Sequence, residues 1–366
     1  MEDTRHLKRA SRIVVSVFIA IVLVYGVYFM PLPLFIFSAG TAEVIRPMVH
    51  VNQNNDEEQG AFMLTTVRVS DATVFSYLLT FIRPFEELHL KTELLQKNES
   101  EEEYSQRQEV NMLSSQSSAI QAAYHHLGIP YRISTDGVVI VQVFKDFPAH
   151  EVLQPGDYIV KVDDTPIQTK EELQTILKSK KEGDSVSITY KRKKVQKTQS
   201  IQLALLPPDE GASPEVRRVG LGVVPANVQS VKANDESKQV TIKAGDIGGP
   251  SAGLMFTMEI INKLTPEDIT KGYKVAGTGT IDEKGTVGVI GGIQHKIIAA
   301  DKAGAEIFFA PKDYVTPDGK QRINNYSDAA KRAEEIHTSM KVVPVGTLQE
   351  ALDYMNNLPP KAAKAS

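Results

Sequence analysis

The chain of 366 residues has room for two or three domains, and its net charge of −4 gives no support for nucleic-acid binding. It contains no cysteine, which excludes disulfides, thiol nucleophiles and thiolate metal sites. It contains no Gly-x-x-x-x-Gly-Lys-[Ser/Thr] loop, so we expect no standard ATPase module.

The N-terminal segment predicts a membrane anchor. Residues 1–12 are basic, and residues 13–39 carry no charge and are long enough to cross a hydrocarbon core of about 30 Å. Because the basic flank comes first, we expect a cytoplasmic N-terminus and an extracytoplasmic remainder. Pro31 and Pro33 are expected to end the regular helix. A cleaved signal peptide is the alternative, although secretory apolar regions usually run about 7 to 15 residues.

Residues 43–110 form an extracytoplasmic region with few signals. Ala61–Val69 predicts a strand, and Val74–Phe85 predicts a helix that ends at Pro84. The acidic run Glu99–Glu103 is interpreted as a solvated loop or helix surface rather than an ion site.

Residues 111–206 predict a compact unit of short strands. A helix over residues 109–127 ends at the C-cap Gly128. The following elements are the strand Val138–Val143, the turn Leu153–Asp157, the strand Tyr158–Val162, a helix from Thr169 to Lys180 and the strand Val186–Lys191.

The stretches DGVVI and LQPGDYIVKVDDTPI in this unit resemble a PDZ domain. That family binds an extended peptide by adding it as a strand beside a helix. The resemblance implies a groove between the segment Thr135–Ile140 and the helix Lys170–Lys180. The implied peptide-binding residues are Gly137, Val138, Val139 and Ile140.

Residues 207–215 read as a linker, and residues 216–356 as a mixed α and β domain followed by the tail 357–366. Within this domain the sequence predicts helices at Ala252–Leu264, Ile293–Ala303, Ser327–Thr338 and Thr347–Met355. It predicts strands at Val219–Val224, Gln239–Lys243, Lys274–Ile281, Thr286–Ile290, Ile307–Ala310 and Lys341–Val345.

Two glycine-rich turns in this domain each lead into a helix. The first places Ser251 at a helix start, where backbone N–H groups can bind a developing oxyanion. The second places Lys296 in a first helical turn among isoleucines. Burial and the positive helix end both lower a lysine pKa, as a lysine base requires. We therefore hypothesise that Ser251 and Lys296 meet as nucleophile and base.

A purely structural interpretation remains open at this point. Gly-Pro-Ser-Ala-Gly also describes a proline-initiated helix in which Ser251 is a capping residue. Local chemistry permits the Ser–Lys pair without establishing it.

Residues 216–356 resemble the proteolytic domain of Lon proteases, peptidase family S16. The matching motifs are GGPSAG, GTGTIDEKGTVGVIGGIQHK and AADKAGAEIFFAP. The resemblance implies that Ser251 is the nucleophile and Lys296, 45 positions later, is its base. It also implies that Thr278 lies near the lysine amine and orients it, with Gly249 and Pro250 supporting the serine turn.

One position departs from the Lon pattern. Many members have aspartate three residues before the serine, where this chain has Gly248. Asp246 stands close by in the sequence without an assigned role. The departure concerns an acidic residue and leaves the proposed dyad intact.

The order of anchor, PDZ unit and Lon-type domain resembles the membrane-bound PDZ–Lon proteases of Gram-positive bacteria, the YlbL-like family. The expected fold class is α+β multidomain, with an N-terminal transmembrane helix, a PDZ-like β-rich domain and a Lon-type α/β proteolytic domain. The resemblance implies an ATP-independent serine endopeptidase at the outer face of the cell membrane that cleaves peptides or flexible protein segments.

The implied partners are peptide or protein substrates and the bilayer around residues 13–39, without nucleic acid, ATP, metal or another cofactor. Because related Lon domains form rings, the resemblance also admits a homo-oligomer. The competing hypothesis is a peptide-binding PDZ scaffold on an inactive Lon-like platform. Retention of both Ser251 and Lys296 in their full motifs favours the enzyme.

Overall fold

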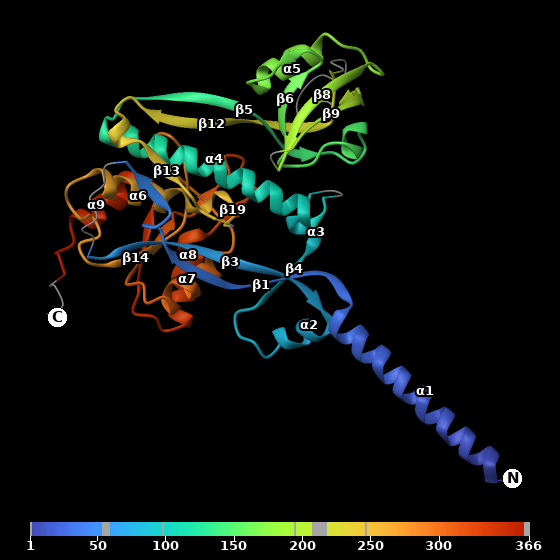
Figure 1. The fold of residues 1–366 in the computed structure, drawn as a ribbon. Coiled ribbons are helices and arrows are strands. Elements are labelled where there is room, and N and C mark those ends of the chain that lie inside the picture. The colour runs from blue at the N-terminus through green and yellow to red at the C-terminus, as the bar shows by residue number, and fades with distance from the viewer. Residues whose placement is uncertain are drawn as a thin grey trace.

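The computed structural model describes residues 2–52, 59–96, 99–193, 195–206, 218–245 and 247–361, with side chains from residue 12 onward. The predicted linker 207–215, Asp246 and the end of the predicted tail lie outside the described residues. Figure 1 shows an isolated helix that leads into a larger domain, with a smaller β-rich domain above it.

Helix α1 (Glu2–Phe29) stands away from the body (Figure 1). Its segment Arg12–Phe29 has a mean hydropathy of 2.3 and is long and apolar enough to cross a membrane, a test that a signal sequence also passes. The predicted span 13–39 is too long, because the chain from Pro31 forms strand β1 (Pro31–Val44). Proline cannot continue a helix, and the apolar side chains beyond it are buried in a sheet instead.

The larger domain is built on a six-stranded sheet with the order β20-β17-β14-β3-β1-β4. The other bounds are β3 (Ala61–Thr73), β4 (Glu87–Leu90), β14 (Lys274–Gly277), β17 (Ile307–Pro311) and β20 (Lys341–Val345). Strand β14 is parallel to β3 and to β17, and β17 is parallel to β20, whereas β1 is antiparallel to both of its neighbours.

This topology corrects the predicted domain boundaries. Residues 43–110 do not form a separate region, because β3 lies in the middle of the sheet that residues 216–356 otherwise supply. Parallel pairing between strands more than 200 residues apart has no local sequence signal.

Helices cover both faces of the sheet (Figure 1). They are α6 (Gly253–Leu264), α7 (Ile293–Lys302), α8 (Asn325–Glu335) and α9 (Leu348–Asn356), all within a few residues of their predicted places. Successive strand residues point to opposite faces. Accordingly Phe62 and Leu64 pack in the core with α6 and α9, and Met63 packs in the core with α7 and α8.

The smaller domain has its own hydrophobic core. Its elements are β5 (Tyr131–Val143), η1 (Pro148–Glu151), β6 (Tyr158–Val162), β7 (Thr165–Pro166), α5 (Lys170–Lys178), β8 (Ser185–Arg192), β9 (Val195–Gln202) and β12 (Val223–Ala233). Its sheet has the order β12-β5-β6-β8-β9. Strand β12 was expected in the other domain, but it pairs with β5 over the full length of both strands. Residues on both sides of the predicted linker 207–215 therefore belong to the smaller domain, so this linker does not mark the boundary between the two domains.

Helix α4 (Glu101–Leu127) ends at Gly128, whose φ of 63° makes it the predicted C-cap. The prediction placed this helix with the smaller domain. It instead buries Ala119, Ala123 and Tyr124 in the core of the larger domain, together with residues of α6. In Figure 1 it crosses the top of that domain beneath the β5–β12 ribbon.

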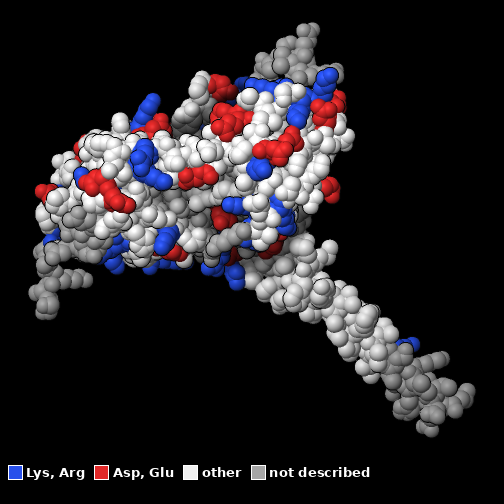
Figure 2. All heavy atoms as spheres, turned by 45° about the horizontal axis from the view of Figure 1, so that its top comes forward, with Lys and Arg blue, Asp and Glu red and all other residues white. Residues whose placement is uncertain are grey.

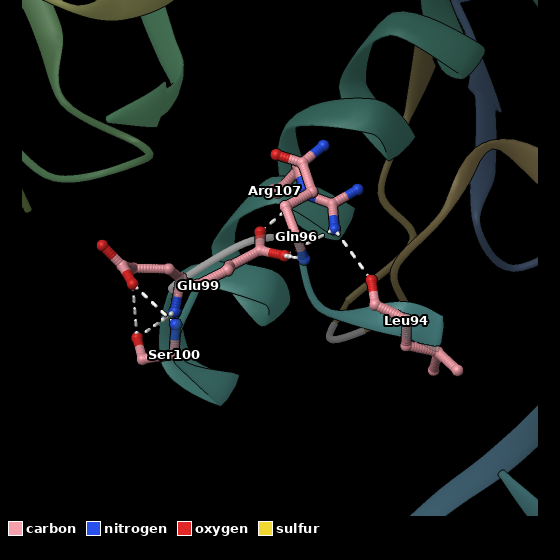
Figure 3. Close-up of polar contacts among 6 residues, drawn as sticks. Leu94, Gln96, Glu99, Ser100 and Arg107 are labelled. Carbon is pink, nitrogen blue, oxygen red and sulfur yellow. Dashed lines mark hydrogen bonds and ion pairs between the residues drawn. The ribbon is translucent and has the colours of Figure 1, made fainter. Parts of the chain in front are cut away.

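Polar contacts fix the first turns of α4 (Figure 3). Ser100 caps the helix in a capping box with Glu103. Arg107 donates to both carboxylate oxygens of Glu99, at 2.7 and 2.8 Å. The Glu99 side chain is only 4% exposed, so the acidic run is not simply a solvated surface as predicted. The pair holds the N-terminal half of α4 in place.

The remaining described elements are short. They are β2 (Val49–Val51), α2 (Val74–Thr80), α3 (Lys91–Leu94), β10 (Ala204–Leu206), β11 (Arg218–Gly220), η2 (Glu236–Lys238), β13 (Val240–Ile242), η3 (Pro250–Ala252), β15 (Thr280–Ile281), β16 (Val287–Gly288), β18 (Tyr314–Val315) and β19 (Arg322–Ile323). Strand β13 pairs with β2 and leads into the turn that carries Ser251.

Candidate active site

Ser251 lies in the 3₁₀ turn η3, which leads directly into α6. Gly249 precedes this turn with a φ of 87°, in a region that residues with a side chain rarely adopt. Its N–H donates to the carbonyl of Gln108 at 2.8 Å. Ser115 Oγ donates to the carbonyl of Pro250 at 2.9 Å. Two successive regions of α4 thus hold the serine turn.

Lys296 extends from the first turns of α7, which begins after Gly292 in the left-handed conformation. Its Nζ lies 2.9 Å from Ser251 Oγ and 2.7 Å from the carbonyl oxygen of Thr65 on β3. The lysine is only 4% exposed. The structure therefore brings together the two residues that the sequence paired, and adds a third group that neither motif contains.

Burial lowers the pKa of Lys296 from 10.5 to about 7. An ammonium ion in an apolar interior loses its hydration, so the neutral amine is favoured. In the neutral form, an Nζ–H donates to Thr65 and the nitrogen lone pair can accept the hydroxyl proton of Ser251. The distance and the lowered pKa are those that a general base next to a nucleophile requires.

Thr278 is fully buried and lies on the other side of Ser251. Its hydroxyl donates to the carbonyl oxygen of Ser251 at 3.0 Å, and Gly279 N–H donates to the same oxygen at 2.8 Å. The expectation that Thr278 orients the lysine amine therefore differs from the structure. The threonine orients the serine backbone instead, and the carbonyl of Thr65 occupies the place beside the amine.

The three supporting residues Thr65, Gln108 and Ser115 were not predicted from the sequence. Thr65 lies in the predicted strand Ala61–Val69, but its partner is 231 positions away. Ser115 lies three residues after Met112 and four before Ala119, so it shares the helix face of these two buried residues. A serine between apolar residues on one helix face is a sequence signal for a polar contact there.

The residue before the lysine, His295, is completely buried. Burial lowers the pKa of His295 although Glu87 Oε2 lies 3.4 Å from its Nε2. A neutral imidazole at this position adds no positive charge beside Lys296. Glu87 also accepts a hydrogen bond from Gln294 at 2.8 Å, so β4 contacts the start of the lysine helix.

The predicted peptide-binding residues of the smaller domain are not at a free edge. Gly137 and Ile140 pair with β12, and Val138 and Val139 pair with both β12 and β6. A strand with neighbours on both sides cannot accept a third. The predicted groove at residues 137–140 is therefore wrong, because β12 of the same chain occupies that side.

Strand β12 forms one edge of this sheet, and β9 forms the other. Strand β12 lies beside the start of α5, where Lys170 N–H donates to Asn227 Oδ1 at 2.6 Å and Asn227 Nδ2 donates to Glu171 at 3.1 Å. A strand edge beside a helix is the arrangement on which peptide addition depends. In this structure β12 provides it, in place of β5.

Within the described ranges, no group of three or more His, Cys, Asp or Glu side chains is placed to hold a metal ion.

Comparison with known proteins divides the chain into the same two kinds of domain. Residues 125–203 match the family model of the PDZ domain, and residues 218–356 match that of the Lon protease (S16) C-terminal proteolytic domain. Neither model covers residues 31–73, which supply β1 and β3 of the larger domain.

Curated relatives are similar to the larger domain. The Lon protease of Metamycoplasma arthritidis is 34% identical over 107 residues, which are 29% of this chain and 11% of that protein. The Lon protease of Mycoplasma mobile is 29% identical over 147 residues, which are 38% of this chain and 16% of that protein. The chain thus spans only a small part of the length of these relatives.

Solved structures are similar to the smaller domain. The PDZ domain of an SdrC-like protein from Listeria monocytogenes is 30% identical, with a TM-score of 0.22, and the match covers 26% of this chain and 92% of that one. The corresponding domain from Listeria innocua is also 30% identical, with a TM-score of 0.22, over 25% and 93% of the two chains.

The family models and the curated relatives agree with the two motif sets in the sequence. The S16 match and the curated Lon proteases both relate this chain to the proteolytic domain of a peptidase family. The chain combines a PDZ domain with the proteolytic domain of the Lon (S16) family, and with its apolar N-terminal helix it fits the membrane-anchored PDZ–Lon architecture.

Proposed function

We propose that the chain is an ATP-independent serine endopeptidase whose nucleophile is Ser251 and whose general base is Lys296. The observation that carries this proposal is the 2.9 Å contact between Lys296 Nζ and Ser251 Oγ at a buried lysine. A lysine pKa of about 7 leaves a large neutral fraction at physiological pH.

In the proposed reaction, the neutral amine of Lys296 removes the hydroxyl proton as Ser251 Oγ attacks the peptide carbonyl. The tetrahedral intermediate collapses, and the ammonium returns that proton to the departing amine. The product is an acyl ester on Ser251. Lys296 then takes a proton from an incoming water, and the second collapse releases the acid and restores the hydroxyl.

Neighbouring groups support both partners in this scheme. The Thr65 carbonyl directs the amine, and the donors Thr278 and Gly279 fix the serine carbonyl. Gly249 N–H is already bonded to Gln108. We therefore assign oxyanion stabilisation to N–H groups further along the turn, beginning with that of Ser251 itself.

We propose that the PDZ domain captures or gates the substrate. An extended peptide would add to the part of the β12 edge beside the start of α5, because further along the strand the Gln239 side chain already bonds to the backbone of Val231 and Ala233. The sequence contains no P-loop for a motor that could unfold a stable protein. The substrate class that we propose is therefore peptides and flexible protein segments.

We further propose that α1 anchors the chain with the catalytic domain on the outer face of the membrane. The apolar segment Arg12–Phe29 and the basic residues before it support this orientation. Figure 2 shows that the helix surface next to the body is uncharged, with a basic side chain only near the far end of its described part, whereas both signs of charge are mixed on the body.

The proposed activity is tested by peptide cleavage with the full chain in detergent. Wild type should cleave members of a random peptide pool with or without ATP, and Ser251→Ala and Lys296→Ala should not. The matched controls Ser200→Ala and Lys302→Ala change exposed residues away from the dyad and should retain activity. Peptide binding with equal background cleavage in all variants would refute the enzyme and favour a PDZ scaffold on an inactive platform.

A further inference from the structure

An exposed apolar surface lies on α2 and the turn that follows it. We call it the α2 patch, and it consists of Phe75, Leu78, Phe81 and Ile82. These side chains are 37%, 57%, 71% and 76% exposed, respectively. Apart from α1, the described part of the chain has no other large hydrophobic side chains as exposed as Phe81 and Ile82.

Helical spacing and the following turn together form this patch. Phe75 and Leu78 lie three residues apart on one face of α2, and Phe81 and Ile82 follow directly in the turn after the helix. Helix α2 contains no buried residue, so this face does not pack into the body. A capping box between Thr73 and Ser76 nevertheless forms the helix start. An ordered helix that leaves its apolar face in water needs a partner.

The location of the patch indicates which partner. The Phe75 ring stacks on Tyr28 of α1, with ring centroids 4.4 Å apart. Tyr28 lies in the last turn of the apolar segment, and Tyr25 and Phe29 stack beside it. Figure 1 shows α2 next to the body end of α1. The α2 patch therefore lies beside the body end of the apolar segment Arg12–Phe29 and extends the apolar surface of α1 there.

The charges around the patch favour a lipid surface. Between residues 72 and 85 the single charged side chain is Arg83, which is 55% exposed and forms an ion pair with Glu86 at 3.4 Å. Aromatic rings and an arginine at one level are typical of the boundary between acyl chains and phosphate headgroups. In Figure 2 the surface where α1 meets the body is largely uncharged.

We propose that the α2 patch inserts into the outer headgroup–acyl boundary of the bilayer that α1 spans. This inference rests on the proposed anchoring by α1. The rest of the chain then contacts the membrane at two places, α1 and the α2 patch, rather than at α1 alone. The aromatic and aliphatic side chains enter the boundary, and Arg83, which pairs with Glu86, lies at the level of the lipid headgroups.

The second contact is joined to the candidate active site at both of its ends. Strand β3 runs directly into α2 and carries Thr65, whose carbonyl accepts from Lys296. The chain after α2 returns as β4, where Glu87 bonds to Gln294 on the lysine helix. Insertion of the patch would therefore hold the lysine helix at a fixed place relative to the membrane surface. This favours membrane-proximal segments as substrates.

The test uses the full chain in lipid nanodiscs and exploits the absence of cysteine. Single-cysteine variants carry an environment-sensitive fluorophore at Ile82→Cys in the patch, at Val17→Cys in α1 and at Val195→Cys on the PDZ domain. All three residues are more than half exposed, so the substitutions leave the core intact. Lipids with a quencher placed shallow or deep along the acyl chain report depth.

We expect loss of fluorescence at Ile82 with the shallow quencher, at Val17 with the deep quencher, and at Val195 with neither. Quenching at Val17 without quenching at Ile82 would overturn the α2 contact and retain the anchor. Quenching at Ile82 alone would retain the contact and refute the anchor. No quenching at either position would overturn both. A blue shift at Ile82 without lipid quenching would mean that a second copy or another protein covers the patch, which also overturns the proposal.

Discussion

The pH dependence of peptide cleavage tests the protonation state of Lys296. If the neutral amine is the base, kcat/KM rises with pH through a single ionisation whose midpoint lies near the lysine pKa of about 7. At pH 7 about half of the molecules would then be competent. A lysine with the ordinary pKa of about 10.4 would be neutral in roughly one molecule in 2,500 at that pH.

The lowered pKa of Lys296 also makes the free energy of unfolding depend on pH, and the direction of this dependence follows from the shift. Because the folded pKa lies below the unfolded one, the unfolded chain binds more protons between about pH 7 and about pH 10.4. The free energy of unfolding should therefore rise with pH across that window. The full penalty, present below pH 7, is on the order of 5 kcal/mol at about 1.4 kcal/mol per pKa unit. Lys296→Met removes the buried charge and should raise the melting temperature at pH 6.

The assay measures kcat/KM for one peptide between pH 5.5 and 9.5 at constant ionic strength, with melting curves for Lys296→Met in parallel. The matched control Lys302→Ala, an exposed lysine on the same helix, should keep the midpoint of wild type. A midpoint above pH 9, or a rate that does not change over the range while chemistry is rate-limiting, would refute a lysine base.

Three further predictions concern the residues around the dyad. Thr278→Val keeps the shape but removes the hydrogen bond to the Ser251 carbonyl, so kcat should fall about tenfold, as expected for roughly 1.4 kcal/mol, with KM unchanged in steady-state kinetics. Gly249→Ala places a methyl group at a φ of 87° and should lose most cleavage, at a strain of about 1–3 kcal/mol, while circular dichroism remains that of wild type. Arg107→Met leaves the buried Glu99 unpaired and should lower the urea unfolding free energy by about 3 kcal/mol, and adding Glu99→Met should restore part of that loss.

The placement of Ser251 and Lys296 could be predicted because both sit in short glycine-rich motifs at helix starts. Such motifs define local backbone geometry, and the resemblance to Lon proteases supplied the pairing. The role of Thr278 was less predictable. Its position was correct, but whether its hydroxyl meets the lysine or the serine carbonyl depends on a turn geometry that the motif does not encode.

Long-range pairing explains most of what the sequence analysis missed. The carbonyl of Thr65 reaches Lys296 only because β3 inserts parallel to β14, and no local pattern indicates that partner. The groove predicted at residues 137–140 failed for the same reason. Strand β12 lies more than 80 residues further along the chain and occupies the side that a peptide was expected to take.

The N-terminal apolar stretch shows a different limit. Residues 13–39 are uncharged throughout, so composition alone describes one continuous span. Pro31 divides it into a helix and a strand, and the strand buries its apolar side chains in the sheet. An apolar sequence predicts that its side chains are shielded from water, but it does not distinguish burial in a bilayer from burial in a protein core.

The most direct test of the Ser–Lys dyad is covalent trapping. The full chain is treated at pH 8 with a serine-directed fluorophosphonate, and the modified residue is mapped by mass spectrometry. We predict a single adduct on Ser251 in wild type and a strongly reduced rate of labelling in Lys296→Met, with Lys302→Ala labelled like wild type. Labelling of Ser251 at the wild-type rate in Lys296→Met, or labelling of another residue alone, would contradict the account.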